Sequence, residues 1–400
     1  MRTAVVGGGA AGFFLAINLK EMAPAMDVTI LERSQHVLAK VKVSGGGRCN
    51  CTNSFASVRD LSAVYPRGHR LLKRLFKQFD YHDAYEWFER HGVRLTTQDD
   101  ECVFPASQDS QTIIDCFLAE ARRHHINIYT GVSVGSLDDL RDYDFVAICA
   151  GGQPRAEGLR WLAEAGHDIV QPVPSLFTLS IADEALRALM GTVVEGVQVC
   201  IPGTKLRADG PLLITHWGIS GPAVLRLSSY AARHLSEADY QLPLSINWTG
   251  QSETAVREQL TAIVDQHPQK QLPTVRPCGL PMRLWDYLLT KTLGQRAQGR
   301  WQSLNTKELN RLVNVLTNDT CQTAGRAAFR DEFVTCGGVS LASVNPSTLE
   351  SRAVSRLYFS GEVLDIDGIT GGFNFQAAWT TAYVVAHSIA GYYHNEKTNQ

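Results

Sequence analysis

The sequence has no long uncharged apolar run, and its first residues have no basic segment followed by an apolar stretch and a small-residue cleavage site. A helix needs about 20 mostly apolar residues to cross a bilayer, so we expect no transmembrane helix. The apolar residues near the start instead surround a group of glycines, which is not the pattern of a leader peptide. These absences together favour a cytoplasmic protein with no membrane partner.

Charge of neither sign is in excess. The chain has 38 Lys and Arg against 40 Asp and Glu, which gives a formal net charge of −2. Proteins that bind nucleic acid through its phosphates usually carry a basic excess, so we expect no nucleic-acid partner and a small-molecule substrate instead. The length of 400 residues predicts two or three domains. The composition leaves the oligomeric state open.

Paired cysteines are also lacking. The nine cysteines are scattered, and no two of them form a C-x-x-C pair. Cys49 and Cys51 are separated by a single residue, which is too short for a thioredoxin-like redox pair. No further ligands cluster near them in the sequence, so we expect no metal site. The pattern predicts reduced thiols in a reducing compartment.

A glycine-rich motif follows a short apolar strand at residues 3–6. The motif is Gly7-x-Gly9-x-x-Gly12, and the apolar residues after it begin a helix. A second apolar run ends on Glu32. Strand, glycine turn, helix, strand and acid in this order form a dinucleotide-binding fingerprint. The motif therefore predicts a Rossmann-like domain, against the alternative of a plain strand-to-helix turn.

Each residue of the fingerprint has a physical task. Gly7 permits a tight turn, Gly9 lets the backbone approach a pyrophosphate, and Gly12 lets helix and strand pack closely. The helix N-terminus offers N–H groups and a partial positive charge to the phosphates. Glu32 is expected to accept hydrogen bonds from ribose hydroxyls, which disfavours a 2′-phosphate, although Arg33 beside it partly offsets this argument.

A second glycine-rich segment, Ser44–Asn53, contains three consecutive glycines followed by Arg48. Three glycines are unfavourable inside a helix or a strand, but they allow the backbone to lie close to a ligand. Arg48 and the neighbouring amide side chains are suitable donors to phosphate or flavin groups. We therefore predict a cofactor-binding loop rather than a flexible surface hairpin.

The end of the chain repeats the pattern of strand, glycine loop and helix. Residues 357–365 read as a strand that ends in Gly361-Glu-Val-Leu-Asp365, and Gly371-Gly-Phe-Asn374 then opens a long helix. Asp365 is expected to hold ribityl hydroxyls, and the helix N-terminus is expected to face an electron-rich flavin edge. The alternative is a helix that docks on the domain through a glycine hinge.

The composition changes in the middle of the chain. Residues 172–250 alternate short β-like runs with turns, which predicts an inserted antiparallel domain. Residues 251–331 have a helical apolar period, which predicts a small helical subdomain. Within the β region, Thr215–Pro222 places His216 among glycine, serine and proline. His216 is a candidate proton donor, against the alternative of a structural histidine.

Two observations favour FAD over NAD. Glycine-rich loops recur at both ends of the chain, so distant segments would enclose a large ligand. Residues 130–330 contain no second strand–glycine–helix fingerprint of the kind that a pyridine-nucleotide disulfide reductase has. We therefore expect an α/β protein with a discontinuous Rossmann-like FAD-binding domain, an inserted antiparallel β domain and a small helical domain. The expected boundaries are 1–171 and 346–400 for the FAD-binding domain, 172–250 and 332–345 for the β domain, and 251–331 for the helical domain.

Four segments together resemble the YhiN-like family of bacterial flavoproteins, which are NAD(P)/FAD-dependent oxidoreductases also described as the aminoacetone-oxidase family. These segments are Gly7–Gly12, Ser44–Asn53, Thr215–Pro222 and Gly361–Gln376. The resemblance covers essentially the whole chain, and the serine–triple-glycine–Arg-Cys-Asn run is highly specific. It implies that Gly7 completes the fingerprint and that a further set of matching residues contacts FAD. These residues are Gly9, Ala11, Gly12, Glu32, Arg33, Lys42, Gly47, Arg48, Val134, Gly361, Asp365 and Asn374.

The resemblance also implies a reaction, in which flavin N5 exchanges a hydride with an organic substrate. One branch of the family reduces conjugated enones of 3-dehydro bile acids. We therefore expect an FAD-dependent oxidoreductase that uses electrons from NADH or NADPH, with Arg48 and the C-terminal helix stabilising the reduced flavin. Two alternatives stay open. One is an amine or aminoketone oxidase that uses O₂, and the other is a flavin-containing RNA-binding or RNA-modifying protein, which the charge balance disfavours.

Overall fold

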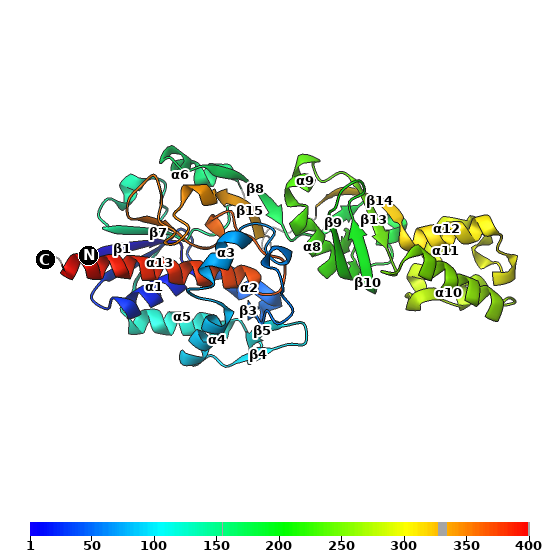
Figure 1. Cartoon of the computed structure of the whole chain (residues 1–400), viewed down its shortest axis with the longest axis horizontal. Coiled ribbons are helices and arrows are strands. Elements are labelled where there is room, and N and C mark those ends of the chain that lie inside the picture. Colours follow the sequence, from blue (N-terminus) through cyan, green and yellow to red (C-terminus); the bar gives the residue numbers. More distant parts are fainter. Residues whose placement is uncertain (154, 327–333, 399–400) are drawn as a thin grey trace. The chain divides into compact units, whose positions relative to one another are not determined.

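The computed structural model describes residues 1–153, 155–326 and 334–398 (Figure 1). The chain divides into two compact units, the first formed by Met1–Ser175 with Arg330–Gln400 and the second by Leu176–Phe329. The first unit is therefore built from both ends of the chain, as the sequence predicts for a discontinuous domain. Within the described residues, no helix is long and apolar enough to cross a membrane.

A five-stranded sheet in the order β16-β7-β1-β2-β6 forms the core of the first unit. All of its neighbouring strands pair in parallel. Because β1 and β16 both flank β7, the two ends of the chain meet in one sheet. The carboxyl ends of parallel strands share one edge, which is where ligands bind in such sheets. The strands are β1 (Arg2–Val6), β2 (Asp27–Glu32), β6 (Asn127–Thr130), β7 (Phe145–Ile148) and β16 (Leu357–Phe359).

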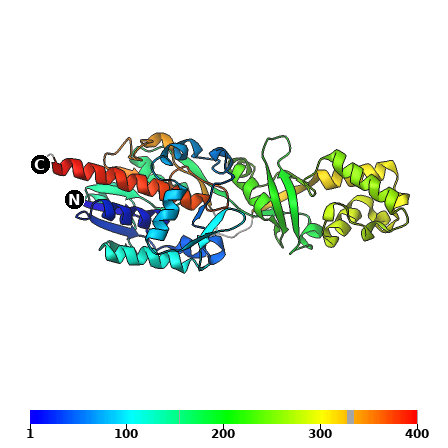
Figure 2. The ribbon, with the colours of Figure 1, turned by 60° about the horizontal axis from the view of Figure 1, so that its bottom comes forward.

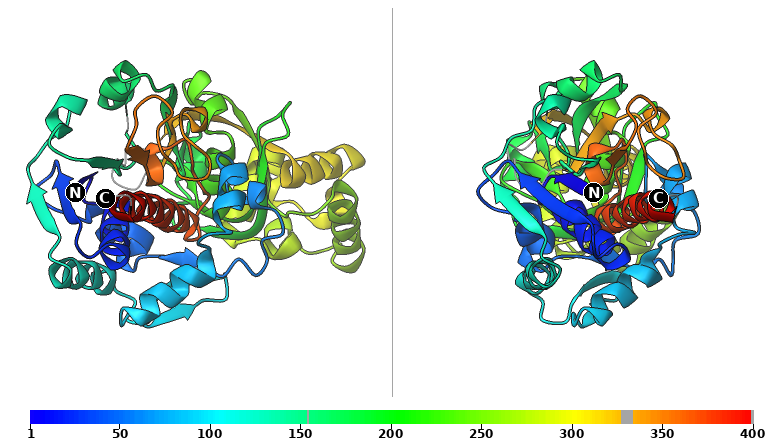
Figure 3. Two further views of the ribbon diagram at one scale, coloured as in Figure 1. Left: turned by 60° about the vertical axis from the view of Figure 1, so that its left-hand side comes forward. Right: turned by 90° about the vertical axis from the view of Figure 1, so that its left-hand side faces the viewer.

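Two long helices pack side by side on this sheet. Helix α1 (Ala10–Met22) lies along α13 (Phe373–Thr398), and the start of β1 and the end of α13 lie at the same end of the unit (Figures 2 and 3). The two helices share an aromatic core, in which the Phe14 ring centroid lies 4.5 Å from that of Trp87 and 5.1 Å from that of Trp379. All three side chains are fully buried. This core holds the start and the end of the chain together.

An apolar period near 3.6 residues predicts one helical region over residues 69–91, whereas the structure has two helices there, α3 (His69–Leu75) and α4 (Tyr81–Arg90). The break has a local cause, because Asp80 caps α4. Its carboxylate accepts from the backbone N–H of His82 at 2.8 Å, and the Asp83 carboxylate accepts from the N–H of Asp80 at 2.7 Å. This reciprocal capping box starts a new helix where the apolar period alone indicates a continuous one.

The remaining elements of the first unit surround this core. The run Val132 to Leu137 predicts a short strand, but residues 132–136 form irregular backbone after Gly131, which has a φ of +73°, and Leu137 begins a short 3-10 helix. The other elements are α2 (Ala39–Gly47), β3 (Thr52–Asn53), β4 (Leu95–Thr97), β5 (Cys102–Pro105), α5 (Gln111–Arg123) and α6 (Arg160–Glu164).

One part of the chain lies in a different unit from the one expected. Strands β8 (Ile169–Ser175) and β15 (Val334–Val339) pair with each other in antiparallel orientation, and both belong to the first unit. The sequence reading placed residues 332–345 with the inserted β domain, of which 332 and 333 lie outside the described residues. The strand pairing places residues 334–345 in the first unit instead. Strand β15 pairs with β8, which precedes the insertion in the sequence and belongs to the first unit.

The second unit contains a closed antiparallel barrel in the order β10-β11-β12-β9-β14-β13. Its last strand, β14, follows the helical segment and closes the barrel against β13 and β9. Residues 319–326 are therefore barrel rather than part of the expected helical domain. The barrel strands are β9 (Leu179–Ile181), β10 (Val193–Cys200), β11 (Arg207–Ile214), β12 (Gly218–Ser220), β13 (Pro243–Asn247) and β14 (Asp319–Arg326). The helices are α7 (Glu184–Arg187), α8 (Pro222–Tyr230), α9 (Ala232–Glu237), α10 (Glu253–Gln266), α11 (Met282–Leu293) and α12 (Thr306–Thr317).

Candidate cofactor site

The first and last glycines of the fingerprint are required by the packing of the protein itself. Gly7 has a φ of +113°, and a Cβ added to it would lie 2.3 Å from the backbone oxygen of Cys149. A Cβ added to Gly12 would lie 2.0 Å from the backbone oxygen of Gly7. The predicted tasks of a tight turn and of close helix–strand packing therefore have a direct steric basis.

Gly9 differs from its two partners because the protein does not crowd it. No described heavy atom lies within 4 Å of an added Cβ, and Gly9 is the N-cap of α1. No side chain caps this helix, and its first turn contains no acidic residue. The helix therefore presents backbone N–H groups and a partial positive charge to an open space. This arrangement fits a pyrophosphate, which needs donors, positive potential and room.

The carboxylate of Glu32 holds the glycine turn in place. Its Oε2 accepts from the backbone N–H of Gly8 at 2.8 Å, and its Oε1 accepts from the N–H of Ser34 at 2.7 Å. A carboxylate oxygen has more than one lone pair, so both oxygens retain capacity for ribose hydroxyls. The sequence predicted only the ligand contact, whereas the structure adds this support of the loop. Arg33 is exposed beside it.

The triple-glycine segment forms the predicted irregular loop. Helix α2 is interrupted at Ser44, and the three glycines that follow have φ angles of +57°, +67° and +84°. A Cβ added to Gly46 or Gly47 would meet no described atom within 4 Å. As at Gly9, the backbone of this loop borders open space that a ligand can approach.

Arg48 of this loop and Lys42, which precedes it in α2, both contact neighbouring elements of the first unit. The guanidinium of Arg48 lies 4.3 Å from the centroid of the Phe104 ring, and its Nε donates to the backbone oxygen of Gly45 at 3.2 Å. The ammonium of Lys42 donates to Oε1 of Gln111 at 2.9 Å. These contacts fix the loop against β5 and α5. The expected FAD contacts of Arg48 and Lys42 stay predictions.

Hydrogen bonds join the segment after the triple-glycine loop to the C-terminal glycine loop. Asn53 Nδ2 donates to the backbone oxygen of Gly371 at 3.0 Å, and Thr52 Oγ1 donates to Oε1 of Gln376 at 2.6 Å. The indole N–H of Trp379 donates to the backbone oxygen of Cys51 at 2.7 Å. Residues more than 300 positions apart in the sequence therefore form one buried network.

Asn374 fixes the C-terminal loop with both ends of its amide. Its Oδ1 accepts from the N–H of Gly368 at 2.8 Å, and its Nδ2 donates to the backbone oxygen of the same residue at 2.9 Å. A cofactor contact from Asn374 would therefore come from its backbone, in the first turn of α13. Gly361, with a φ of +77°, would place a Cβ 2.9 Å from that of Ala11, so this glycine allows the loop to touch the start of α1.

Two ion pairs near this loop were not anticipated from the sequence. Asp367, whose side chain is fully buried, pairs with Arg67 through both carboxylate oxygens, and Ser175 Oγ donates to it at 3.0 Å. Glu362 pairs with Lys40 at 2.8 Å. Both acids lie within three residues of Asp365, which is half-buried. Three acids close together in a glycine-rich segment could have indicated such ion pairs. The cationic partners could not be predicted, because they are distant in the sequence.

The structure does not bring every predicted residue to this site. Val134 is half-buried in the irregular segment after β6, so no strand supports the contact expected from it. His216 belongs to the second unit and lies exposed at the tip of the hairpin between β11 and β12. Its ring centroid lies 4.7 Å from that of Trp217. The site of the first unit is therefore built without His216.

The parallel sheet, the uncapped glycine turn at α1, the acid at the end of β2 and the second glycine loop from the end of the chain define a Rossmann-type flavoprotein. The sequence profile of the HI0933-like protein Rossmann domain family matches residues 1–388, and the chain belongs to this family. It is an FAD-dependent oxidoreductase.

Two characterised relatives are similar over nearly the full length. The chain is 28% identical over 417 residues to the 3-dehydro-bile acid delta(4,6)-reductase of Clostridium scindens, which covers 97% of this chain and 99% of the relative. It is 28% identical over 408 residues to the ribosomal RNA dihydrouridine synthase of Escherichia coli, covering 96% and 97%. Among solved structures, 3-ketosteroid delta1-dehydrogenase from Sterolibacterium denitrificans is 10% identical with a TM-score of 0.46, over 98% of this chain and 99% of that one.

Proposed function

We propose that this protein saturates a carbon–carbon double bond conjugated to a carbonyl group, with NADH or NADPH as reductant. The names of the two relatives describe reductions of this kind, one of an unsaturated 3-dehydro bile acid and one of uridine in RNA. Their substrates differ greatly in size and charge, so the reaction is the feature that the two have in common. In the balanced reaction, a hydride and a proton add across the double bond and NAD(P)⁺ is released.

The observation that carries the proposal is the open, uncapped N-terminus of α1 at Gly9. FAD, when bound, supplies hydride-transfer chemistry, and the protein supplies binding and electrostatics. The N–H groups of α1 would hold the phosphates, and Glu32 would hold ribose hydroxyls. The N-terminus of α13, fixed by Asn374, adds a second partial positive charge that favours an electron-rich group.

His216 is our candidate for the proton donor. It is exposed at a hairpin tip beside Trp217, whose side chain is 42% exposed. The backbone of this tip is fixed by two hydrogen bonds. The N–H of Thr215 donates to the backbone oxygen of Gly218 at 2.8 Å, and the N–H of Gly218 donates to the backbone oxygen of Thr215 at 3.2 Å. An imidazole and an indole on a fixed turn can contact an organic substrate without a large loss of conformational freedom.

Two substrate classes follow from the relatives. A small or sterol-like enone agrees with the net charge of −2, since it needs no basic surface. Uridine within ribosomal RNA is the second candidate, and the Escherichia coli relative is the observation that favours it. A protein that binds RNA through phosphates needs local positive charge even when the whole chain is neutral. The expectation of no nucleic-acid partner therefore stays a prediction.

The test is an anaerobic assay of FAD-reconstituted protein with NADH or NADPH. One arm contains a 3-ketosteroid with unsaturated 4,6 bonds, and the other contains an unmodified ribosomal RNA transcript. We expect oxidation of the nicotinamide to be coupled to a gain of two hydrogens in one of the two substrates, measured by mass spectrometry. The His216→Ala variant should bind FAD normally and saturate the substrate at least about a hundredfold more slowly, the lower end of the range for a lost general acid.

Three results would contradict parts of this account. Failure of both nicotinamides to reduce the bound flavin would remove the proposed reductant. Release of peroxide in air with an amine or aminoketone substrate would favour an oxidase. Unchanged turnover of His216→Ala would remove this residue from the mechanism while leaving the reaction in place.

A further inference from the structure

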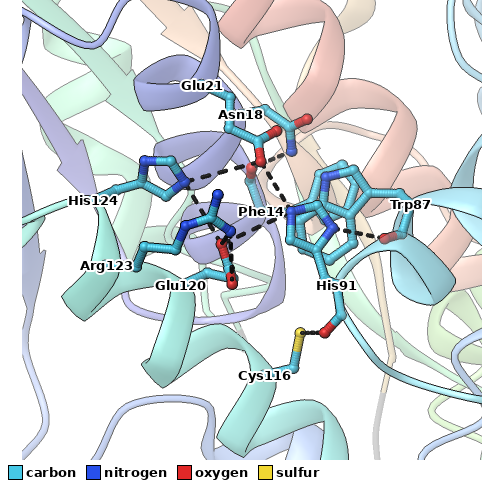
Figure 4. Close-up of polar contacts among 9 residues, drawn as sticks. All are labelled: Phe14, Asn18, Glu21, Trp87, His91, Cys116, Glu120, Arg123 and His124. Carbon is cyan, nitrogen blue, oxygen red and sulfur yellow. Dashed lines mark hydrogen bonds and ion pairs between the residues drawn. The ribbon is translucent and has the colours of Figure 1, made fainter.

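Four potential metal ligands meet at the opposite end of α1 from the glycine turn (Figure 4). Glu21 belongs to the last turn of α1, His91 follows α4, Glu120 belongs to the last turn of α5, and His124 follows α5. All four side chains belong to the first unit, and none of them belongs to the cofactor site. The cluster therefore joins three helices that the Rossmann site does not explain.

Each imidazole of the cluster lies within 4 Å of both carboxylates. His91 Nε2 lies 2.9 Å from Glu21 Oε1 and 3.9 Å from Glu120 Oε2. His124 Nε2 lies 3.6 Å from Glu120 Oε2 and 3.9 Å from Glu21 Oε1. Bonds of about 2.0–2.1 Å from zinc to nitrogen and oxygen place neighbouring tetrahedral ligands about 3.3 Å apart. Glu21, His91 and Glu120 offer ligand atoms that all lie within 4.8 Å of one another, and His124 lies beside the two carboxylates. Binding of one ion by all four residues would therefore draw the two imidazoles toward each other.

His91 is oriented like a metal ligand. Its Nδ1 lies 2.7 Å from the backbone oxygen of Trp87, and a carbonyl oxygen only accepts, so Nδ1 carries the proton. Nε2 donates to Oε1 of Glu21 at 2.9 Å, and a bound cation would take the place of this proton, since an imidazole that ligates a metal is neutral. The side chain is only 6% exposed, and its ring centroid lies 3.9 Å from that of Trp87. A backbone carbonyl that fixes the tautomer in this way is the usual outer contact of a metal-bound histidine.

His124 supplies a second, independent observation. Its Nε2 atom is buried and has no hydrogen-bond partner among the described residues. Buried polar atoms are nearly always hydrogen-bonded, so an imidazole nitrogen that lies 3.6 and 3.9 Å from two carboxylates without a hydrogen bond requires an explanation. A cation between the four residues would pair this atom.

The charges of the cluster also suit a divalent cation. Two carboxylates face two imidazoles that are neutral when they act as ligands. The neighbouring cation Arg123 contacts Glu120 at 3.1 Å, but its side chain is 67% exposed, so solvent screens this contact. A divalent ion would balance the two negative charges from within.

We propose that Glu21, His91, Glu120 and His124 bind one zinc-type divalent ion that ties α1, α4 and α5 together. Mixed imidazole and carboxylate ligands favour such a transition metal over Mg²⁺ or Ca²⁺, which prefer oxygen ligands alone. Four protein ligands leave no open coordination position, so the ion would have a structural role. The competing arrangement is a metal-free ion pair between protonated His91 and the two glutamates.

The test uses the full-length, FAD-loaded protein after treatment with a chelator. Titration with Zn²⁺ should show one tight site per chain, and Zn²⁺ should raise the unfolding temperature. Titration with Co²⁺ should give the visible bands of a tetrahedral nitrogen–oxygen site without a thiolate charge-transfer band, which excludes the nine cysteines as ligands.

Three variants assign the site. Glu120→Gln and His124→Gln should each weaken Zn²⁺ affinity at least about tenfold and reduce the rise in unfolding temperature at the same Zn²⁺ concentration. His125→Asn is the matched control, because His125 is exposed with a φ of +51° that asparagine tolerates, and its affinity should equal that of the wild type. If either variant fails to fold, Glu21→Gln replaces it, since this side chain is the most exposed of the four at 31%. Absence of a tight Zn²⁺ site in the wild type, or equal affinity in the ligand variants, would overturn the proposal in favour of the ion pair.

Discussion

At the residue scale, two glycines of one motif serve different purposes. Gly12 is enclosed by the protein, since an added Cβ would lie 2.0 Å from the backbone oxygen of Gly7. Gly9 borders open space and has a φ of −92°, which any residue adopts. The requirement for glycine at position 12 therefore comes from folding, whereas the requirement at position 9 comes from the ligand.

The pair Gly12→Ala and Gly9→Ala separates these two purposes. We expect Gly12→Ala to destabilise the protein by about 1–3 kcal/mol, the usual cost of forcing a methyl group into a packed site. Gly9→Ala should change the stability of the FAD-free protein by less than about 0.5 kcal/mol, as a surface substitution does. It should nevertheless weaken FAD binding at least about tenfold, a difference of about 1.4 kcal/mol.

Urea denaturation and FAD titration measure the two effects. Each variant is the control for the other, since both add one methyl group to the same turn. An FAD affinity of Gly9→Ala equal to that of the wild type would show that the pyrophosphate does not lie at this turn.

At the element scale, Glu362 links three segments of the first unit. Its Oε2 accepts from Lys40 of α2 at 2.8 Å, and its Oε1 accepts from the N–H of Thr335 in β15 at 2.8 Å. Burial raises the pKa of this carboxyl, but Lys40 and the backbone N–H groups of Thr335 and Gly152 outweigh burial, so its pKa is lowered. The ionised form therefore stabilises the fold.

This lowered pKa predicts a pH-dependent stability. We expect Glu362→Gln to unfold more easily than the wild type at pH 7, by about 1–3 kcal/mol, because a charge-assisted contact is lost. A group with a lowered folded pKa contributes its full stability above its unfolded pKa of about 4.3 and loses it as the pH falls through the folded value. The difference between wild type and variant should therefore be constant from about pH 7 to 5 and shrink below about pH 4.

Urea denaturation across this pH range measures the difference. Lys40→Gln is the matched variant, since removal of the cation should move the loss of stability to higher pH. A difference that already shrinks near neutral pH in the wild type would mean that burial dominates the pKa of Glu362.

The elements themselves show what local sequence can predict. Strand β1, the glycine turn and Glu32 follow from apolar periods and spacing, and the structure confirms them. The break between α3 and α4 follows from Asp80, whose capping role was overlooked beside a strong apolar period. The pairing of β15 with β8 spans the whole insertion, so the sequence of either strand could not indicate its partner.

The cofactor site shows the same limit of prediction from local sequence. Its glycines were identifiable because a backbone requirement appears directly as a residue type. The hydrogen bonds of Thr52 and Asn53 to the C-terminal segment, and of Trp379 back to Cys51, were not identifiable, since each contact depends on tertiary packing. The residues of the proposed metal site show no signal in the sequence for the same reason, because Glu21, His91 and Glu120 come from three separate segments and have no short-range spacing pattern.

At the scale of the whole molecule, the first and last segments of the chain share one sheet and one buried network. Strands β1 and β16 flank β7, and α1 packs along α13. The central claim is that this convergence builds one FAD site with two helix N-termini, at Gly9 and near Asn374. Loss of either end of the chain should abolish the site, because neither segment alone supplies both helices.

Hydrogen–deuterium exchange of the full-length protein, with and without FAD, tests this claim most directly. We expect FAD to bind at one equivalent per chain and to slow exchange in two separate segments, residues 8–13 and residues 365–376. Peptides from β10 and α10 of the second unit serve as internal references for global stabilisation. Protection of only one of the two segments, or no uptake of FAD, would contradict a cofactor site assembled from both ends of the chain.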